Sequence, residues 1–504
     1  MPVADPVIAL ENVSIAFGDK RVLDGLTLDI PRGKTTVIVG RSGSGKTLLL
    51  KLMSGLVTPD HGRVRLFDRD LAALSYDELL ELRARMAMLF QNYALFDDMS
   101  VADNVELPLR ETAHLSPADA ARQAHELIEM LGLADSAHLL PGALSGGMKR
   151  RAALARALVA RPDVALFDEP TTGLDPVMVE QVDELITSAR RRFATTMVII
   201  THELASVRRL ADRIGFLHDG KIIFVGTYDE LMHCELAPVR AFLADASPER
   251  AATTVPSAER PVIELVGVHK RFDDKVVLRG VDLAIYPHRI TALIGGSGSG
   301  KSVLVKHIMG LLQPDRGKVL VFGDDIVAMN ERQLKSVRTR LALVFQHAAL
   351  LDWLDVEDSV AFPLVEQRRL SSDEIHARVH DVIERLGLAP LRRRMPHELS
   401  VGERKRVGLA RAMVMQPEIL IYDEPTTGQD PVRAHEIDDM IVQAQEQFGV
   451  TTIVISHDIL STFRIAHTVA MLHDGAIVAC GTPAELRAST DASVHQFLRA
   501  ASVV

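Results

Sequence analysis

Residues 40–47 read Gly40-Arg41-Ser42-Gly43-Ser44-Gly45-Lys46-Thr47, and residues 295–302 read Gly295-Gly296-Ser297-Gly298-Ser299-Gly300-Lys301-Ser302. Both stretches have the pattern of a phosphate-binding loop, in which glycines let backbone N–H groups turn toward phosphate oxygens. A helix that begins at such a loop adds its partial positive charge. We expect Lys46 and Lys301 to reach the β- and γ-phosphates, and Thr47 and Ser302 to hold Mg²⁺. The alternative is a purely structural glycine-rich turn, and a second copy in the same context argues against it.

The two loops are 255 residues apart (295 − 40). The same offset relates other polar positions to one another: Gln91 to Gln346, Ser145 to Ser400, Asp168 to Asp423, Glu169 to Glu424 and His202 to His457. A chain of 504 residues is also too long for a single core. We therefore predict two duplicated domains, residues 1–249 and 262–504, joined by a short, polar, proline-containing linker at residues 250–261.

Within each half, short apolar runs alternate with helical patterns. Apolar runs end at both phosphate loops and at both Asp-Glu pairs, which is typical of parallel strands buried on both faces. The predicted fold is α/β, with a parallel sheet, an antiparallel β edge from residues 7–17 and 262–272, and a helical subdomain around residues 116–133 and 371–388. We expect a nucleotide-binding fold in each half.

Bulk composition argues against several classes of protein. The formal net charge is −10, whereas a nucleic-acid binder usually has a basic excess. Cys234 and Cys480 are the only cysteines and are not repeat partners, which indicates a reducing compartment. We find no signal peptide and no apolar run of the roughly 20 residues that a spanning helix needs. A membrane part, if the protein acts at a membrane, is expected in another chain.

Each of two buried strands ends in a pair of carboxylates, Asp168-Glu169 and Asp423-Glu424. The aspartate at a strand end suits the Mg²⁺ shell, and the next glutamate suits orientation of an attacking water. A solvated strand end is the alternative. Both pairs continue identically as Pro-Thr-Thr-Gly and reach an aspartate, Asp175 or Asp430, which argues against it.

The order of these motifs resembles that of ATP-binding-cassette (ABC) ATPases over nearly the whole of both halves. The resemblance implies ATP and Mg²⁺ as cofactors and two cassettes that close head to tail around two ATP molecules. Signature loops would be Ser145, Gly146 and Gly147 in the first half, and Ser400 and Gly402 in the second. Gln91 and Gln346 would form Q-loops that contact Mg²⁺, Asp175 and Asp430 would form D-loops, and Glu169, His202, Glu424 and His457 would be catalytic.

Three further features have competing interpretations. Phe17 and Phe272 fall where the family stacks an aromatic on adenine, but an isolated Phe in a strand is often core. The basic runs 149–151 and 404–406 are interpreted as a solvated helical face or phosphate-side charge rather than as a nucleic-acid site. The second signature has Val401 where the first has glycine, so we expect slower hydrolysis at the site that uses it, because Val lacks the backbone freedom of Gly and is branched.

The segment after Gln91 suggests the partner. Aromatic residues make up only 4% of the chain, yet Phe90, Tyr93 and Phe96 cluster there, and Phe345, Trp353 and Phe362 lie in the equivalent stretch. Exposed aromatic groups beside a nucleotide-sensing glutamine suit a socket for a permease helix, with ordinary packing as the alternative. The stretch from Ala94 to Glu111, with the signature Ser-Gly-Gly-Met, resembles the ATPase of Mla/Mce-type phospholipid transporters.

That resemblance implies an ATPase subunit of a bacterial lipid transporter, at the cytoplasmic face of the inner membrane, which powers permease and substrate-binding subunits. It is weaker in the second half, where Glu403 replaces Met148. Pairing within one chain is favoured by high effective concentration. The alternatives are a tandem sugar-importer ATPase, against which the segment after Gln91 argues, and a twin-cassette protein of ribosomes or DNA, for which a long charged linker or zinc sites are missing.

Overall fold

The computed structural model describes residues 5–90, 93–111, 115–244, 260–273, 275–346 and 348–501. Contacts divide the chain into two compact units: unit 1 holds Met1–Leu174, Met178–Ala246 and Gly428–Val432, and unit 2 holds Asp175–Val177, Ser247–Thr427 and Arg433–Val504. The predicted linker at 250–261 lies outside the described residues, except for its last two positions. Within the described part of the chain, no helix combines the length and the apolar character needed to cross a membrane.

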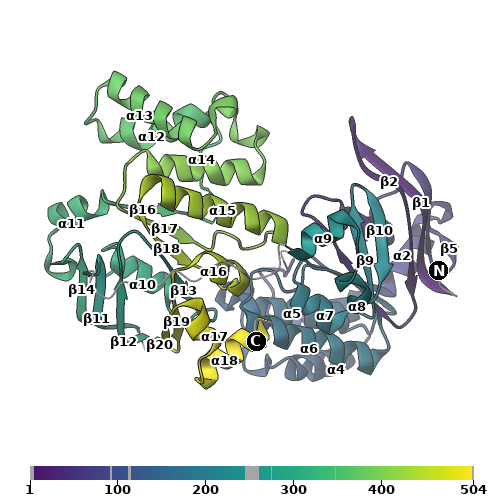
Figure 1. Ribbon diagram of the computed structural model, residues 1–504. Helices are drawn as coiled ribbons and strands as arrows, with labels where there is room; N and C mark the ends of the chain where they lie inside the picture. The colour runs from purple at the N-terminus through teal and green to yellow at the C-terminus, as the bar shows by residue number, and fades with distance from the viewer. Residues whose placement is uncertain are drawn as a thin grey trace. The chain divides into compact units, whose positions relative to one another are not determined.

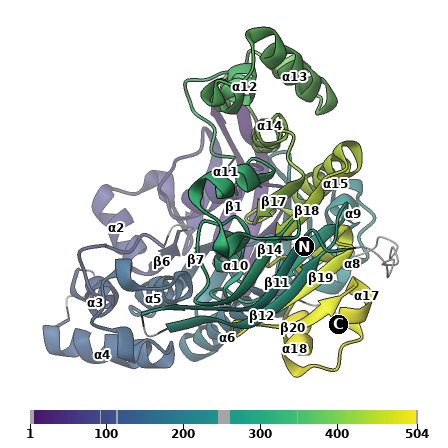
Figure 2. The same cartoon turned by 90° about the vertical axis from the view of Figure 1, so that its left-hand side faces the viewer.

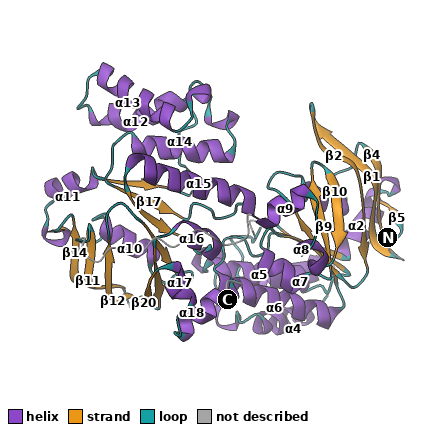
Figure 3. Ribbon diagram, viewed as in Figure 1, coloured by secondary structure: helices purple, strands orange, loops and turns teal. Residues whose placement is uncertain are grey.

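The two halves of the chain have the same succession of elements (Figures 1 and 3). The strands of the first half are β1 (Pro6–Phe17), β2 (Lys20–Pro31), β3 (Thr35–Val39), β4 (His61–Leu66), β5 (Arg69–Asp70), β6 (Met86–Leu89), β7 (Val164–Asp168), β8 (Thr196–Ile200), β9 (Arg213–His218) and β10 (Lys221–Gly226). Its helices are α1 (Lys46–Met53), α2 (Tyr76–Ala84), α3 (Val101–Glu111), α4 (Pro117–Met130), α5 (Gly146–Leu158), α6 (Pro176–Phe193), α7 (Leu204–Leu210), α8 (Tyr228–Met232) and α9 (Ala237–Ala244).

The second half repeats this order. Its strands are β11 (Ile263–Phe272), β12 (Lys275–Ile285), β13 (Ile290–Ile294), β14 (Arg316–Val321), β15 (Asp324–Asp325), β16 (Leu341–Val344), β17 (Ile419–Asp423), β18 (Thr451–Ile455), β19 (Thr468–His473) and β20 (Ala476–Gly481). Its helices are α10 (Lys301–Ile308), α11 (Glu331–Arg338), α12 (Val356–Gln367), α13 (Ser372–Arg385), α14 (Val401–Met413), α15 (Pro431–Phe448), α16 (Ile459–Ile465), α17 (Pro483–Arg487) and α18 (Ala492–Ala500).

Each half contains a mixed sheet and a separate antiparallel sheet. The mixed sheets have the orders β10-β9-β3-β8-β7-β6 and β16-β17-β18-β13-β19-β20, parallel except where β10 and β20 pair at one edge. The early strands β1 and β11 form four-stranded antiparallel sheets of their own, in the orders β2-β1-β4-β5 and β12-β11-β14-β15. The predicted α/β fold with an antiparallel part is therefore confirmed, and residues 7–17 and 262–272 belong to a second sheet rather than to the edge of the first.

Alternating side chains explain why the mixed sheet of the first half is covered on both faces. Ile38 of β3 packs in the core that α1 shares with the antiparallel sheet, whereas Val37 and Val39 face the core built with α3–α6. In the second half, α10 packs on β11, β12 and β14 in the same way (Figure 2). The predicted helical subdomain contains α3 and α4, or α12 and α13, packed on the signature helix α5 or α14. This scaffold brings the loops after β3, β7 and β8 to one edge of the sheet.

Candidate active site

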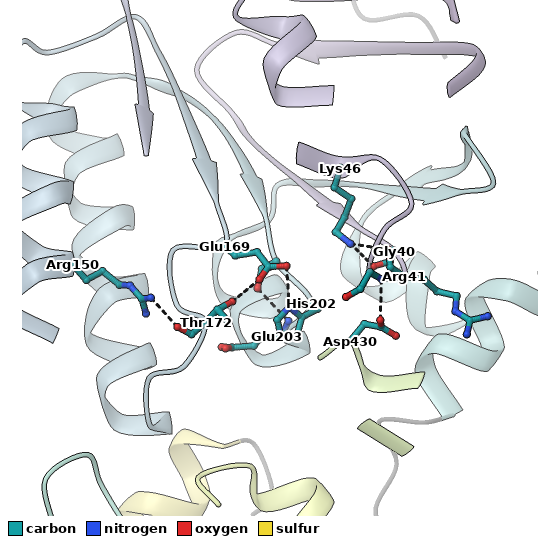
Figure 4. A network of polar contacts seen from close by, with 11 residues as sticks. Gly40, Arg41, Lys46, Arg150, Glu169, Thr172, His202, Glu203 and Asp430 are labelled. Carbon is teal, nitrogen blue, oxygen red and sulfur yellow. Dashed lines mark hydrogen bonds and ion pairs between the residues drawn. The ribbon is translucent and has the colours of Figure 1, made fainter. Parts of the chain in front are cut away.

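The phosphate loop of unit 1 follows directly from β3 and leads into α1. Gly40, Gly43 and Gly45 all have positive φ angles, and a Cβ on Gly40 would approach the carbonyl oxygen of Leu217 to 2.2 Å, so only glycine fits there. Gly45 caps α1. The buried Lys46 Nζ donates to the carbonyls of Gly40 at 2.7 Å and Arg41 at 2.9 Å (Figure 4).

Unit 2 builds its phosphate loop in the same way. Lys301 Nζ donates to the carbonyls of Gly295 at 2.7 Å and Gly296 at 3.1 Å. The hydroxyls of Ser44 and Ser299 are buried within the two loops and have no hydrogen-bond partner among the described residues. A buried polar group without a partner costs free energy. Phosphate oxygens would satisfy these hydroxyls, and the loops therefore fit an anionic nucleotide.

One carboxylate and one hydroxyl meet beside the loop of unit 1. The Thr47 hydroxyl donates to Asp168, which lies at the end of β7. Burial raises the pKa of Asp168, and the Thr47 hydrogen bond acts against that rise. In unit 2, burial and the adjacent Glu424 raise the pKa of Asp423. Among the described residues, no group of three or more His, Cys, Asp or Glu side chains could hold a metal. The Thr47 hydroxyl and the Asp168 carboxylate are oxygen groups of the kind that Mg²⁺ takes beside phosphate and water.

Glu169 is held by its neighbours in a strained backbone conformation. Its φ is 51°, and its N–H donates to the Ile200 carbonyl at 2.9 Å. The side chain meets His202 Nδ1 at 3.3 Å and accepts from the Thr172 hydroxyl at 2.8 Å (Figure 4). Left-handed non-glycine residues are costly and gather at functional sites. Burial opposes ionisation, but the hydrogen bonds and charges around Glu169 prevail and lower its pKa to about 2.

The equivalent pair in unit 2 has the same arrangement. Glu424 has a φ of 52°, lies 2.7 Å from His457 Nδ1 and accepts from the Thr427 hydroxyl at 2.8 Å. Its pKa is lowered, since the contacts with His457 and Thr427 outweigh the effect of burial. A glutamate paired with the lone histidine is therefore present in both units.

The predicted D-loop aspartates each lie in the compact unit of the other sequence half. Asp430, in the segment that belongs to unit 1, accepts from the Ser42 N–H at 2.9 Å (Figure 4). Asp175, in the segment that belongs to unit 2, accepts from the Ser297 N–H at 2.8 Å. Both aspartates thus contact a phosphate loop. Gln91 lies outside the described residues, and Gln346 is half-buried in the turn after β16.

The signature serines are helix N-caps. Ser145 Oγ accepts from the Met148 N–H at 3.3 Å, and Ser400 Oγ accepts from the Glu403 N–H at 3.3 Å. In unit 2 alone, the carboxylate at this position folds back, and Glu403 Oε2 accepts from the Ser400 N–H at 2.7 Å. The expectation that Val401 lacks a needed backbone freedom is wrong, because Gly146 is not left-handed and a Cβ there would meet nothing within 4 Å.

Exposure removes one alternative for each of two features that the sequence left open. Phe17 and Phe272 are 59% and 43% exposed, so neither is an ordinary core residue. The middle members of the basic runs, Arg150 and Lys405, are buried rather than on a solvated face. The sequence contains one indication that these two residues are buried. Both lie five residues after a signature serine, on the turn of the helix that faces the Pro-Thr-Thr-Gly loop.

Comparisons with known proteins agree with this geometry. The family described as ABC transporter matches residues 23–172 and 278–427. The glutathione import ATP-binding protein GsiA of Escherichia coli strain K12 is 29% identical over 538 residues, which covers 95% of this chain and 86% of that protein. The protein of the same name from Shigella flexneri is 29% identical over 539 residues, with the same two shares.

Solved structures match one half of the chain at a time. The structure of cbiO1 from Clostridium perfringens, part of the ABC transporter complex cbiONQ, has a TM-score of 0.44 and 31% identity, and covers 46% of this chain and 92% of that one. The dimeric bacterial ABC transporter cassette MJ0796 has a TM-score of 0.41 and 31% identity, and covers 44% and 98%. Since the matched family covers more than half of the sequence, in two copies, this chain belongs to the ABC transporter family as a tandem ATP-binding protein with ATPase activity.

Proposed function

We propose that this chain is the ATP-hydrolysing subunit of a bacterial lipid-transporting ABC complex of the Mla/Mce type, bound at the cytoplasmic face of the inner membrane. The single observation that carries the lipid assignment is the segment after Gln91, from Ala94 to Glu111, together with the Ser-Gly-Gly-Met signature. Residues 1–249 and 262–504 would be its two cassettes and residues 250–261 the linker. Integral permease subunits would be its partners, together with substrate-binding subunits of the same type.

The phosphate loops would bind ATP through their backbone N–H groups, their lysines and the buried hydroxyls of Ser44 and Ser299. Thr47 and Asp168 would hold Mg²⁺ in unit 1, with Ser302 and Asp423 in unit 2, and Gln91 and Gln346 would complete those shells. The ion supplies charge neutralisation to the transferring phosphoryl group. Phe17 and Phe272 would stack on adenine, which their exposure favours.

Glu169 and Glu424 would orient the attacking water. A carboxylate whose pKa is about 2 is a poor proton acceptor near neutral pH, so we infer that Glu169 positions the water by accepting its hydrogen bond. His202 and His457 would keep those carboxylates ionised and reach toward the γ-phosphate. The D-loop aspartates and the signature residues (Ser145, Gly146, Gly147, Ser400 and Gly402) would complete the sites when ATP closes the cassettes head to tail.

Exposed apolar side chains support a docking surface for the permease in each unit. Phe96 is 49% exposed and Phe90 is also exposed, whereas Tyr93 is half-buried against the core. In unit 2, Trp353 is 73% exposed, with Phe345 and Phe362 exposed in the same stretch. Exposed aromatic groups of this size mark protein interaction surfaces.

The second candidate is an importer of glutathione or related small peptides. It is favoured by the relatives named for glutathione import, which match this chain over 95% of its length. The identity to these relatives is 29% and extends over both halves. The two candidates therefore differ in their partner subunits rather than in their ATP sites.

Affinity purification of the tagged chain from membranes tests the proposal. Mass spectrometry of the proteins and of the extracted lipids should find Mla/Mce-type permease and substrate-binding subunits with bound phospholipid. Recovery of a peptide or sugar permease, or of ribosomes, would overturn the lipid assignment and leave the ATPase activity in place. A chain with Trp353→Ala would serve as the matched control for specific capture.

A further inference from the structure

A buried arginine on the signature helix of unit 1 has no counterpart in the roles assigned so far. Arg150 is only 3% exposed, and its Nη2 donates to the Tyr93 hydroxyl at 2.9 Å and to the Thr172 carbonyl at 2.7 Å. Its Cζ lies 4.9 Å from the centre of the Tyr93 ring. A buried guanidinium persists only where its partners offset the loss of hydration. The position of Arg150 is thus fixed by Tyr93 and the Thr172 carbonyl together.

These contacts connect two segments that are far apart in the sequence. Tyr93 opens the segment proposed to face the permease, and the Arg156 guanidinium holds the carbonyls of Tyr93 at 3.0 Å and Ala94 at 2.6 Å. At the other end, the Thr172 hydroxyl donates to Glu169 at 2.8 Å. A continuous path therefore runs from the Tyr93 hydroxyl through Arg150 and Thr172 to Glu169 (Figure 4 shows the part from Arg150 onward).

Unit 2 lacks the first part of this path. The residue in the place of Tyr93 is Ala348, which packs against the signature helix, where a Cβ on Gly408 would meet it at 3.1 Å. Lys405 replaces Arg150, and its buried Nζ donates to the Pro425 carbonyl. Burial lowers the pKa of Lys405 to about 8. Arg411 still holds the carbonyls of Ala348 and Ala349. The units therefore differ in the tyrosine hydroxyl, in the forked guanidinium and in the carbonyl that the buried cation contacts, Thr172 in unit 1 and Pro425 in unit 2.

We propose that Arg150 is a positioning residue that transmits movement of the segment beginning at Tyr93 to Glu169. The rate of ATP hydrolysis in unit 1 then depends on the position of that segment, whereas the rate in unit 2 does not. Coupling between sites requires a continuous network of contacts, and the hydrogen bonds of Arg150 supply one. The inference rests on the proposed roles of Glu169 in orienting water and of the segment in docking a permease. It assigns the two cassettes unequal tasks, with unit 1 as the regulated one.

The test isolates each unit in the full chain. In an E424Q background, turnover of ATP depends on Glu169, and Tyr93→Phe removes one hydroxyl while keeping the ring. The loss of one hydrogen bond of ordinary strength should lower kcat by about three- to tenfold, with KM changed by less than about twofold. The same substitution in an E169Q background should leave kcat unchanged. Tyr76→Phe, at an exposed position of α2, is the matched control and should have no effect in either background.

A double-mutant cycle shows whether the hydroxyl acts through Arg150. Arg150→Lys keeps the charge and removes the fork, so Tyr93→Phe should have no further effect on kcat once Arg150→Lys is present. Equal kcat values for the E424Q chains with and without Tyr93→Phe would overturn the inference, as would additive effects of the two substitutions. If the E424Q chain binds ATP but hydrolyses none, the proposed role of Glu169 is wrong, and the inference falls with it. Tyr93→Phe alone, which removes a single oxygen atom, keeps the test valid if Arg150→Lys does not fold.

Discussion

Replacement of His202 by Ala tests the claim that a histidine keeps the glutamate of each unit ionised. In unit 1, burial raises the pKa of Glu169, but the other surroundings outweigh it and lower that pKa from 4.5 to about 2. The hydrogen bond with His202 is the largest of the effects that lower it. At 1.36 kcal/mol per pKa unit, this net lowering corresponds to about 3 kcal/mol. Thr172 and Lys46 supply part of that value. His202→Ala should therefore weaken the local structure around Glu169 by about 1–3 kcal/mol.

Hydrogen exchange followed by mass spectrometry can measure this loss separately in the two units of the full chain. Peptides that cover β7 and the following loop should exchange up to about a hundredfold faster in the variant near pH 6. The equivalent peptides around Glu424 should be unchanged and serve as the internal control. His457→Ala should give the reverse pattern. Unchanged protection around Glu169 in the His202→Ala chain would refute the reasoning.

The effect should depend on pH in a defined direction. The pKa of Glu169 is lowered, so its contribution is present above pH 4.5 and is lost as the pH falls toward about 2. The pKa of His202 is raised, so its contribution is complete below pH 6.5 and is lost as the pH rises through the raised value. The difference between native and variant chains should thus be largest between pH 4.5 and 6.5 and smaller near pH 9. A difference that grows with rising pH would contradict this assignment.

Three further predictions concern separate parts of the chain. Glu169→Gln should reduce ATP turnover less than Glu424→Gln, because the site of Glu169 would be completed by the signature in which the Glu403 carboxylate accepts from the Ser400 N–H; equal losses in a steady-state ATPase assay would remove the asymmetry. Asp183→Ala removes the acceptor of a buried hydrogen bond from the Ser206 hydroxyl at 2.9 Å and of a partly buried one from Arg209 Nε at 2.8 Å. It should cost about 3 kcal/mol in the unfolding free energy, measured by urea titration against the exposed control Glu184→Ala. Trp353→Ala should change the unfolding free energy by less than about 0.5 kcal/mol but reduce recovery of permease subunits from membranes. Undiminished recovery would show that Trp353 is not part of the docking surface.

Much of the fold could be predicted from the sequence because its signals are local and occur twice. The glycines of the phosphate loops and the strand-length apolar runs before them predict the turn between β3 and α1 without knowledge of distant contacts. The same holds for the carboxylate pairs at the ends of β7 and β17. Because of the constant offset of 255 residues, each of these local signals occurs a second time in the chain.

The remainder depended on contacts that periodicity does not encode. An antiparallel strand has the same alternation whether it joins the edge of one sheet or a second sheet, so the position of β1 could not be determined. The basic run around Arg150 indicates a solvated helical face. The burial of Arg150 depends on Tyr93 and Thr172, which are 57 and 22 residues away in the sequence, so a local pattern cannot predict it. Glu403 occupies the position of Met148, and its carboxylate folds back to accept from the Ser400 N–H, a contact that the apolar periodicity does not encode.

We propose that hydrolysis at Glu169 and Glu424 drives movement of phospholipid through a separate permease. The most direct test is to purify the chain with its membrane partners, reconstitute the complex in phospholipid vesicles and measure transfer of a fluorescent phospholipid with and without ATP. We expect ATP-dependent transfer by the native complex, and its loss in the Glu169→Gln/Glu424→Gln complex, which should still assemble. Transfer that persists in the double variant, or ATP-dependent movement of glutathione with none of phospholipid, would contradict the account.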